Sequence, residues 1–411
     1  MIQKPKGTND FFPEVTKKLQ YIESTVRSVA SRFGFGEIRT PTFENTEVFA
    51  RGVGGTTDVV QKEMYTFIDR DGPSFTLRPE GTAGVARAII ENGKYGDAMP
   101  LKYYYIINCF RHERPQAGRF REFSQFGVEM YGSTSPAADA TVISLADTLI
   151  KELGIENVTL HINSIGCPDC RPAYHQKLKD YFASREDELC PTCLSRLESN
   201  PMRILDCKSP ICRDIAKDAP KAIDNLCPDC QSHMDHLKDY LEAFNIKYVI
   251  DTSIVRGLDY YTRTVFEFVC DDIGAQSTIC GGGRYDGLME EIGGSHLPAC
   301  GFAVGITRLL PTVKLPEEND GPIVYIAPMG ERASVWAMGQ IHSLREKGLY
   351  AETDVVGRSL KAQMKYADKI HAKYTLVIGD NELDTKKARL KNMTDSTSTE
   401  IDISQLAECL L

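Results

Sequence analysis

Arginines and glutamates are concentrated in one short stretch of the chain, CFRHERPQAGRFREFSQFGVEMYG at residues 109–132. Aromatic and β-branched residues flank a polar loop, which predicts two strands joined by a charged connection. Guanidinium groups fit phosphate oxygens in shape and charge, so several that converge can bind a polyphosphate and stabilise a phosphoryl group in transfer. The alternative is a solvent-facing set of ion pairs. The charged residues are Arg111, Glu113, Arg114, Arg119, Arg121 and Glu122.

A second chemical pattern is RGLDYYTRTVFEF at residues 256–268. From Thr262 onward the residues alternate as in a strand, but a strand needs no arginine and paired tyrosines at its start. A phenol ring offers a ligand an apolar wall, and its hydroxyl can bond a ring nitrogen. We predict that Arg256, Tyr260 and Tyr261 belong to a binding site. The alternatives are an Arg256–Asp259 ion pair and core packing of the tyrosines.

Eight of the thirteen cysteines lie between residues 167 and 230. The first 30 residues lack the apolar core of a secretory signal, so we expect these thiols to be reduced. Three CxxC pairs and two single cysteines suffice for one or two tetrahedral zinc sites, with buried free thiols as the alternative. The spacing leaves open which of them share an ion. They are Cys167, Cys170, Cys190, Cys193, Cys207, Cys212, Cys227 and Cys230.

Several of these stretches resemble, in order, the motifs of histidyl-tRNA synthetases, which are class II aminoacyl-tRNA synthetases. The FRHE core at 110–113 is similar to the second signature motif of that class. With the tail of the chain, the resemblance covers nearly the whole sequence. The other motifs are KGTNDFFP (6–13), TLRPEGT (76–82), RGLDYYTRTVFEF (256–268), CGGGRYDGL (280–288) and GFAVGITRLL (301–310).

The resemblance implies an adenylation reaction, in which the carboxylate of histidine attacks the α-phosphorus of ATP. Arg111 and Arg256 are then expected to be catalytic cations at that phosphate. Glu113 is expected near the adenine amino group and Arg119 near the outer phosphates, while Arg308 corresponds to the arginine of the third motif. Magnesium is expected as the counter-ion of the pyrophosphate, from the chemistry and not from a metal motif.

The same resemblance predicts where the substrate histidine binds. Two carboxylates suit its ammonium group, and two phenols suit its imidazole. A pocket that satisfies polar edges rejects analogues that lack them by roughly 10⁴. The residues expected there are Glu80, Thr82, Gln125, Glu129, Tyr260 and Tyr261.

The cysteine cluster is not a general property of the family, because many members lack cysteines at these positions. The reaction is therefore not expected to need them, and any zinc would be structural. His233 and His236 follow the last CxxC pair and are the remaining candidate ligands.

These residues need a scaffold, and the patterning predicts an α+β catalytic domain over residues 1–320. Apolar residues at helical spacing predict helices at 14–33 and 136–154, and short aromatic and β-branched runs predict an antiparallel sheet. Residues 167–245 change to short helices, which is typical of an inserted helical subdomain. Strands and helices then alternate over 321–411, which predicts a small α/β domain that resembles an anticodon-binding domain.

Two basic clusters in that last domain, KAQMKYADK and KKARLKN, suit phosphate contacts with folded RNA. The alternatives are a solvated helix face for the first and a charged edge strand for the second.

Composition limits the remaining possibilities. With 411 residues, 42% of them hydrophobic, the chain can bury a large core in two or three units. Its formal net charge of -9 argues against holding nucleic acid by bulk electrostatics. No window has the roughly 20 apolar residues of a membrane span, so we expect a cytoplasmic protein without a membrane partner.

The resemblance thus predicts a histidine–tRNA ligase that uses ATP, L-histidine and histidine tRNA. A homodimer is expected, because the first motif of the family, here the helix from Glu14 and the run EIRTPTFEN, builds a dimer interface. The alternative is the non-catalytic, synthetase-like regulatory subunit of ATP phosphoribosyltransferase. That paralogue shares the catalytic fold but characteristically lacks the tail domain, which this chain has.

Overall fold

In the computed structural model the chain forms two compact units, Met1–Leu315 and Pro316–Leu411. The structure describes residues 1–411 except 56, 71, 116–117, 208, 273–276 and 317–319, so part of the polar run LPEENDGP lies outside the described residues. Within the described residues, no helix combines the length and the apolar character needed to cross a membrane.

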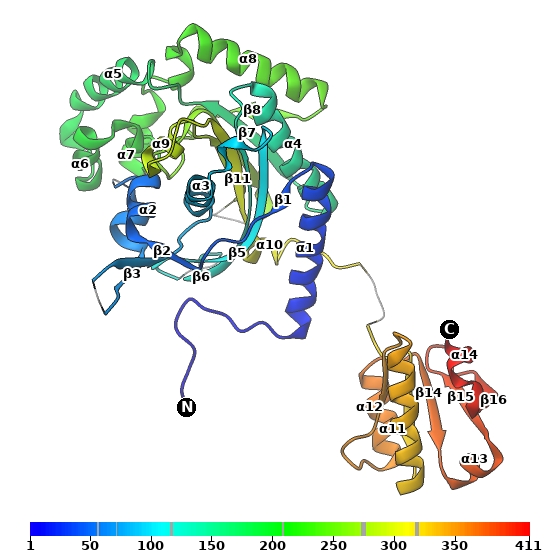
Figure 1. The fold of residues 1–411 in the computed structure, drawn as a ribbon. Coiled ribbons are helices and arrows are strands. Elements are labelled where there is room, and N and C mark those ends of the chain that lie inside the picture. Colours follow the sequence, from blue (N-terminus) through cyan, green and yellow to red (C-terminus); the bar gives the residue numbers. More distant parts are fainter. Residues whose placement is uncertain (56, 71, 116–117, 208, 273–276, 317–319) are drawn as a thin grey trace. The chain divides into compact units, whose positions relative to one another are not determined.

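An eight-stranded sheet is the framework of the first unit (Figure 1). Its order is β1-β5-β6-β11-β10-β9-β7-β8, and every neighbouring pair from β5 to β7 is antiparallel. The predicted antiparallel sheet is therefore confirmed. The strands are β1 (Gly36–Glu37), β5 (Leu101–Phe110), β6 (Glu122–Tyr131), β7 (Val158–Ser164), β8 (Tyr248–Ile250), β9 (Thr262–Cys270), β10 (Thr278–Arg284) and β11 (Ala299–Gly305).

One face of this sheet packs against helices and the other carries polar site residues, as the side chains of β6 show. Side chains alternate along a strand, so Phe126, Val128 and Met130 enter a core packed by helices α1, α4 and α8. Gln125 and Glu129 point to the opposite face. The three covering helices are α1 (Pro13–Arg32), α4 (Pro136–Glu152) and α8 (Pro228–Ala243), of which the first two confirm the helices expected at 14–33 and 136–154.

Smaller elements border the opposite face. A three-stranded sheet of order β2-β4-β3 leads into helix α3, which begins at the end of the TLRPEGT motif. The elements are β2 (Phe43–Asn45), α2 (Thr46–Gly52), the π-helix η1 (Val59–Glu63), β3 (Tyr65–Ile68), β4 (Ser74–Leu77), α3 (Thr82–Glu91), the 3₁₀-helix η2 (Lys94–Gly96), α9 (Leu288–Ile292) and α10 (Ile306–Leu309).

The regular elements in the described part of the predicted insertion are all helices, and the insertion connects β7 to β8. These two strands pair in parallel, and parallel neighbours require a long crossover connection, which the insertion supplies. Before α8 its elements are α5 (Arg171–Ala183), η3 (Glu186–Glu188), α6 (Pro191–Ser199), η4 (Pro201–Ile204), α7 (Pro210–Lys217) and η5 (Ala222–Asn225).

A buried ion pair joins the sheet to its helix layer. Arg284 at the end of β10 is fully buried, and its Nε donates to both carboxylate oxygens of Asp139 in α4 at 3.2 Å. Its other nitrogens donate to Asp286 and to the backbone oxygens of Ser133 and Ser135. Burial alone would raise the pKa of Asp139, but Arg284 and His233 together outweigh it and lower that pKa.

The tail unit is a mixed sheet of order β13-β12-β14-β15-β16 with helices α11 and α12 packed on opposite faces. Its βαβαβ beginning confirms the expected α/β domain. The basic run KKARLKN forms β15, but the edge-strand alternative is wrong because β16 pairs with it. The elements are β12 (Val324–Pro328), α11 (Glu331–Glu346), β13 (Ala351–Thr353), α12 (Leu360–Lys369), β14 (Tyr374–Ile378), α13 (Asp380–Thr385), β15 (Lys387–Asn392), β16 (Ser398–Asp402), η7 (Ile403–Gln405) and α14 (Leu406–Leu410).

We predict that Asp139→Ala destabilises the first unit by about 3 kcal/mol, because it leaves the Arg284 charge buried and short of its main partner. Urea unfolding followed by circular dichroism measures the change. The only tryptophan, Trp336, lies in α11 of the tail, so its fluorescence should report an unchanged tail transition. Glu198→Ala is the matched control, since it breaks only the exposed Lys179–Glu198 pair and should cost less than about 1 kcal/mol. Equal shifts for both variants would contradict the prediction.

Candidate active site

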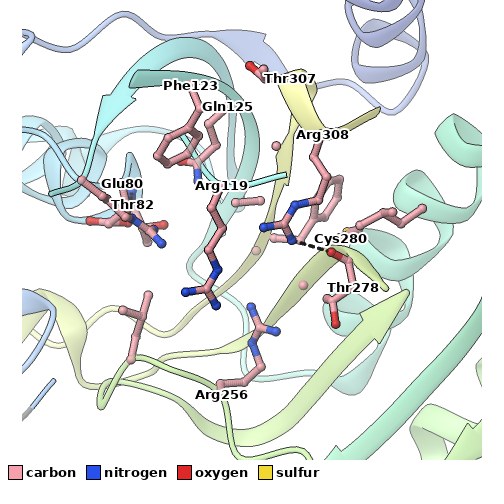
Figure 2. A pocket seen from close by; sticks show the side chains of 18 of the residues that line it. Glu80, Thr82, Arg119, Phe123, Gln125, Arg256, Thr278, Cys280, Thr307 and Arg308 are labelled. Carbon is pink, nitrogen blue, oxygen red and sulfur yellow. Dashed lines mark hydrogen bonds between the residues drawn. The ribbon is translucent and has the colours of Figure 1, made fainter. Parts of the chain in front are cut away.

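One cavity lies over the second face of the large sheet, and nearly all the predicted site residues line it. Figure 2 shows Arg119, Arg256 and Arg308 reaching into this cavity from three different segments of the chain. Glu129 is the exception, because it lies beneath the cavity floor and contacts residues that line it. The predicted residues in the lining are Glu80, Thr82, Arg111, Glu113, Arg119, Gln125, Arg256, Tyr260, Tyr261 and Arg308.

Two buried carboxyl groups form the acidic end of the cavity. Glu80 is 4% exposed and caps helix α3, accepting the backbone N–H groups of Thr82 at 2.7 Å and Ala83 at 2.9 Å. Glu129 is 1% exposed and accepts hydrogen bonds from the hydroxyls of Thr82 at 2.8 Å, Tyr105 at 3.1 Å and Tyr285. Figure 2 shows Glu80 and Thr82 side by side at this end.

Burial makes both carboxyl groups weaker acids than exposed ones. It raises the pKa of Glu129 to about 8, although hydroxyl donors favour the ionised form. Burial also raises the pKa of Glu80, against the N–H groups of α3. A cation that entered this end would favour ionisation of both groups.

Aromatic rings form the wall beside these carboxyls. Tyr260 and Tyr261 are buried, and their ring centroids lie 4.8 Å apart. Both rings pack edge-on against Tyr285, at 5.3 Å and 6.1 Å. The core-packing alternative is therefore correct in part, since these tyrosines pack against each other and also line the cavity.

Three arginines also line the cavity. Arg111 donates through Nε to the backbone oxygen of Pro79 at 2.8 Å, and its guanidinium lies 5.4 Å from the ring centre of Phe123. Arg119 lies 3.1 Å from a carboxylate oxygen of Glu113, and Arg308 donates to the backbone oxygen of Thr278 at 2.8 Å. The ion pairs of the solvent-face alternative exist in part, but they line a cavity.

Arg256 also lines the cavity, and its neighbours hold it in place. It pairs with Glu267 of β9, and its guanidinium lies 5.8 Å from the ring centre of Tyr261. Burial would lower its pKa, but the Glu267 carboxylate raises it, so the group keeps its charge. Among the described residues its buried Nε has no hydrogen-bond acceptor. A Cβ on Gly281 would lie 2.4 Å from the guanidinium, so glycine there leaves room for it.

The cavity has residues that the sequence reasoning missed. Phe123 lies on the same face of β6 as Gln125 and Glu129. The two-residue period of that strand could therefore have predicted that Phe123 faces the cavity. Tyr285 lies in the CGGGRYDGL motif, but no spacing rule connects it to Glu129. Glu267 was visible only as a polar residue within a strand.

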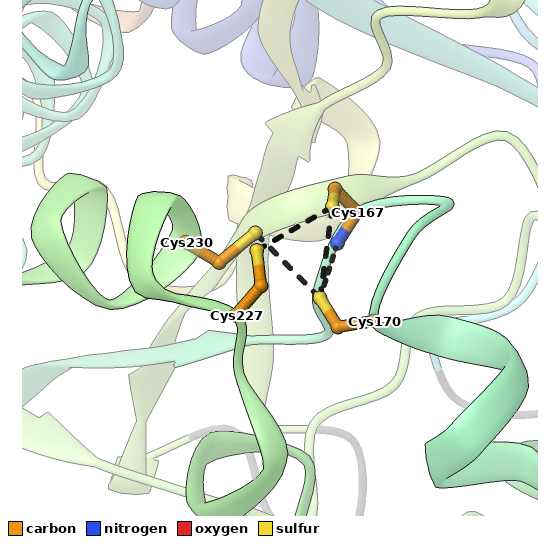
Figure 3. A group of neighbouring side chains, drawn as sticks. All are labelled: Cys167, Cys170, Cys227 and Cys230. Atoms are coloured by element: carbon orange, nitrogen blue, oxygen red, sulfur yellow. Dashed lines mark hydrogen bonds between the residues drawn. The ribbon is translucent and has the colours of Figure 1, made fainter.

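The eight clustered cysteines separate into two groups of four. The first cysteine group is Cys167, Cys170, Cys227 and Cys230, and the second cysteine group is Cys190, Cys193, Cys207 and Cys212. In each group the sulfur atoms all lie within 4.8 Å of one another, so either group could hold a metal ion. Figure 3 shows the four side chains of the first group meeting at the start of α8.

The nearby histidines have other partners. His233 lies 3.4 Å from Asp139, and His236 contacts the backbone oxygen of Ser232 at 2.9 Å.

Comparison with known proteins identifies the family. The profile described as "Histidyl-tRNA synthetase" matches residues 7–170 and 202–309, and the profile described as "Anticodon binding domain" matches residues 323–411. The chain belongs to the histidyl-tRNA synthetase family. The histidine–tRNA ligase of Acetivibrio thermocellus is 51% identical over 99% of this chain and 98% of its own length. That of Halothermothrix orenii is 52% identical with the same coverage.

Solved histidyl-tRNA synthetase structures share the architecture. The apo Staphylococcus aureus histidyl-tRNA synthetase has 37% sequence identity and a TM-score of 0.85, with full coverage of both chains. A Bacillus halodurans protein described as an ATP phosphoribosyltransferase regulatory subunit/histidyl-tRNA synthetase has 24% identity and a TM-score of 0.67 over 92% of this chain and 98% of its own. At that identity the second likeness shows the fold alone. The family profile leaves residues 171–201 of the insertion unmatched.

Proposed function

We propose that this chain is a histidine–tRNA ligase, which activates L-histidine with ATP and transfers it to the 3′ end of its tRNA. The observation that carries the proposal is one cavity that brings buried carboxyl groups and tyrosines together with four arginines from separate segments of the chain. The regulatory-subunit alternative is disfavoured because full-length relatives at 51% and 52% identity are histidine–tRNA ligases and because the anticodon-binding profile matches the tail.

In the proposed first step, a carboxylate oxygen of histidine attacks the α-phosphorus of ATP, and the bond to the bridging oxygen breaks as pyrophosphate leaves. Negative charge increases on the α-phosphate oxygens, and cations already in place stabilise it without reorganisation. We assign Arg111 and Arg256 to this phosphate. Support for Arg256 is its buried Nε without an acceptor and the fixed position that Glu267 and Gly281 give it.

The histidine would lie with its ammonium group toward Glu80 and Glu129 and its imidazole beside the tyrosine rings. Thr82 and Gln125 would complete the polar contacts, and Tyr260 and Tyr261 would provide the wall. Support for this orientation is the position of both buried carboxyls around Thr82, close to the packed rings of Tyr260 and Tyr261.

The nucleotide would lie beside the arginines. We assign Glu113 to the adenine amino group, Arg119 to the outer phosphates, and Arg308 to the same phosphate chain. Magnesium would enter with those phosphates. Support for these assignments is the ion pair of Glu113 Oε2 with Arg119 at 3.1 Å, which holds both side chains at the cavity wall.

In the second step the terminal adenosine of histidine tRNA takes the histidyl group from the adenylate, and AMP leaves. The tail would hold the tRNA. Lys387 and Arg389 alternate on β15 with the buried residues Ala388 and Leu390, so the basic side chains face away from the core. Such a row suits phosphate contacts with folded RNA.

We also propose a homodimer and structural zinc in the insertion. Exposed aromatic and aliphatic residues on the small β2-β4-β3 sheet support an interface: Phe43 is 49% exposed, Phe67 44% and Ile68 76%. Contiguous apolar side chains at a surface are typical of contact sites. The two cysteine groups support zinc, because tetrahedral thiolate sets are its usual structural ligands.

ATP–pyrophosphate exchange with each of the twenty amino acids tests the function. We expect exchange with histidine alone, and we expect Arg256→Ala to lower its kcat by about 10²-fold or more, since the lost cation acts mainly on the transition state. Gel filtration and circular dichroism should show the variant folded and in its native oligomeric state. If folded protein with magnesium showed no exchange with any of the amino acids, the regulatory-subunit alternative would be favoured instead.

A second prediction concerns pH. Burial raises the pKa of Glu129 to about 8, and the histidine ammonium group would favour the ionised form, so binding below that pH releases a proton. The KM for histidine should therefore fall as pH rises toward 8, by up to about tenfold per unit, and then level off. Calorimetry in buffers of different ionisation enthalpy measures the released proton directly. Glu129→Gln should flatten the profile, and an unchanged slope in this variant would contradict the assignment.

A further inference from the structure

The sulfur separations of the first cysteine group have the dimensions of a single tetrahedral ion site. Zinc binds thiolate at about 2.3 Å, which places the four sulfurs of a tetrahedron about 3.8 Å apart. The separation is 3.6 Å from Cys167 to Cys170, 3.8 Å from Cys167 to Cys227 and 3.7 Å from Cys170 to Cys230. The sulfur–sulfur distances within a CxxC pair and between pairs are therefore alike. Two disulfides would instead give two bonded distances of about 2.05 Å and longer distances between the bonded pairs.

The second cysteine group is also compact enough for a single ion, but its cysteines are spaced differently in the sequence. Cys190 lies 3.8 Å from Cys207, and both belong to a set of four whose sulfurs are within 4.8 Å of one another. The group combines one CxxC pair with two single cysteines, which is why the sequence spacing did not assign it. A cluster of several irons would hold its four cysteines farther apart than one ion does, so this geometry favours a mononuclear site.

The backbone around both groups favours thiolates. The N–H of Cys167 donates to the sulfur of Cys170 at 3.2 Å, and the N–H of Cys190 donates to the sulfur of Cys212 at 3.3 Å. Each CxxC pair also lies at the start of a helix, with Cys170 at the N-cap of α5, Cys190 at that of α6 and Cys227 at that of α8. Backbone N–H groups and the helix dipole stabilise negative charge at these positions.

We infer that the insertion holds two separate zinc ions, one in each cysteine group, and that together they position the RGLDYY segment of the histidine pocket. The metal content is independent of the catalytic proposal. The positioning role rests on the proposed histidine activation, because it is tested through the KM for histidine.

The first cysteine group is attached to the end of that segment. Gly166, just before Cys167, accepts the N–H of Arg263 at 2.8 Å, and Ile165 donates to the backbone oxygen of the same arginine at 2.8 Å. Arg171, just after Cys170, donates to the backbone oxygen of Tyr261. The two halves of this group are 60 residues apart in sequence, so one ion would tie both ends of the insertion to the pocket wall.

The second cysteine group is attached to the beginning of the segment. Helix η4 lies between Cys193 and Cys207, and its Arg203 donates to Asp259 at 2.8 Å and to the backbone oxygen of Gly257 at 2.9 Å. Asn200 donates to the same carboxylate at 3.3 Å. An ion that fixes η4 therefore fixes the turn between Arg256 and Tyr260, which has no strand of its own.

Metal analysis of the purified full-length chain tests the sites. We expect two zinc ions per chain, one in the Cys170→Ser/Cys230→Ser variant, and one in the Cys193→Ser/Cys212→Ser variant. Cys409→Ser, which removes an exposed thiol of the tail, should keep two.

If a double variant fails to fold, cobalt(II) titration of the wild-type chain decides the question. Tetrahedral cobalt thiolates absorb strongly in the visible range, and we expect saturation at two equivalents. Fewer than two bound ions, iron in place of zinc, or loss of free thiols to disulfides would overturn the proposal.

Arg203→Ala tests the positioning role with both zinc ions retained. Loss of its contacts lets the segment leave the binding-competent conformation, and histidine binding draws it back. The KM for histidine should therefore rise about tenfold while kcat stays within about twofold. Arg203→Lys should recover part of the affinity, and Arg185→Ala, whose exposed partner is Glu188, should change neither constant.

An unchanged KM in Arg203→Ala, or an equal loss in kcat, would contradict the positioning role. A wild-type chain with two zinc ions but no histidine exchange would refute the proposed function and leave the metal sites standing.

Discussion

The buried ion pair between Arg284 and Asp139 is the contact on which most of the first unit depends. It joins the end of β10 to the first turn of α4, so the sheet and its helix layer meet at one fully desolvated charge pair. The next residue, Tyr285, donates to Glu129 at the floor of the cavity, and His233 of α8 approaches Asp139 from the insertion side. The acidic end of the site, the helix layer and the last helix of the insertion therefore share one electrostatic centre.

The cavity combines buried carboxyl groups with arginines. The carboxyls lie beside the aromatic wall, where burial raises the pKa of both, and the arginines come from separate segments of the chain. Each arginine has backbone or carboxylate partners that fix its position without removing its charge. The charged groups of such a site are oriented when the protein folds, so they need little rearrangement during the reaction, which is what electrostatic preorganisation means.

The sequence predicted the elements and the residue types of the site better than their mutual contacts. Alternation along β5 and β6 and helical spacing in α1 and α4 follow from backbone periodicity, which is local. The pairing of Arg256 with Glu267, by contrast, depends on a turn that no local rule specifies. The grouping of the cysteines was unpredictable for the same reason, because Cys207 and Cys212 reach the second cysteine group through the fold of the insertion and not through their spacing.

The parallel pairing of β7 with β8 has an evolutionary consequence. A parallel pair obliges the chain to cross from one end of the sheet to the other, but it constrains only the two ends of the crossover. The content between those ends can change without disturbing any strand of the sheet. Residues 171–201, which the family profile leaves unmatched, lie in this crossover. Residues 171–201 can therefore change while the strand pairing of the catalytic sheet stays the same, whereas α8 is constrained by its packing on the sheet.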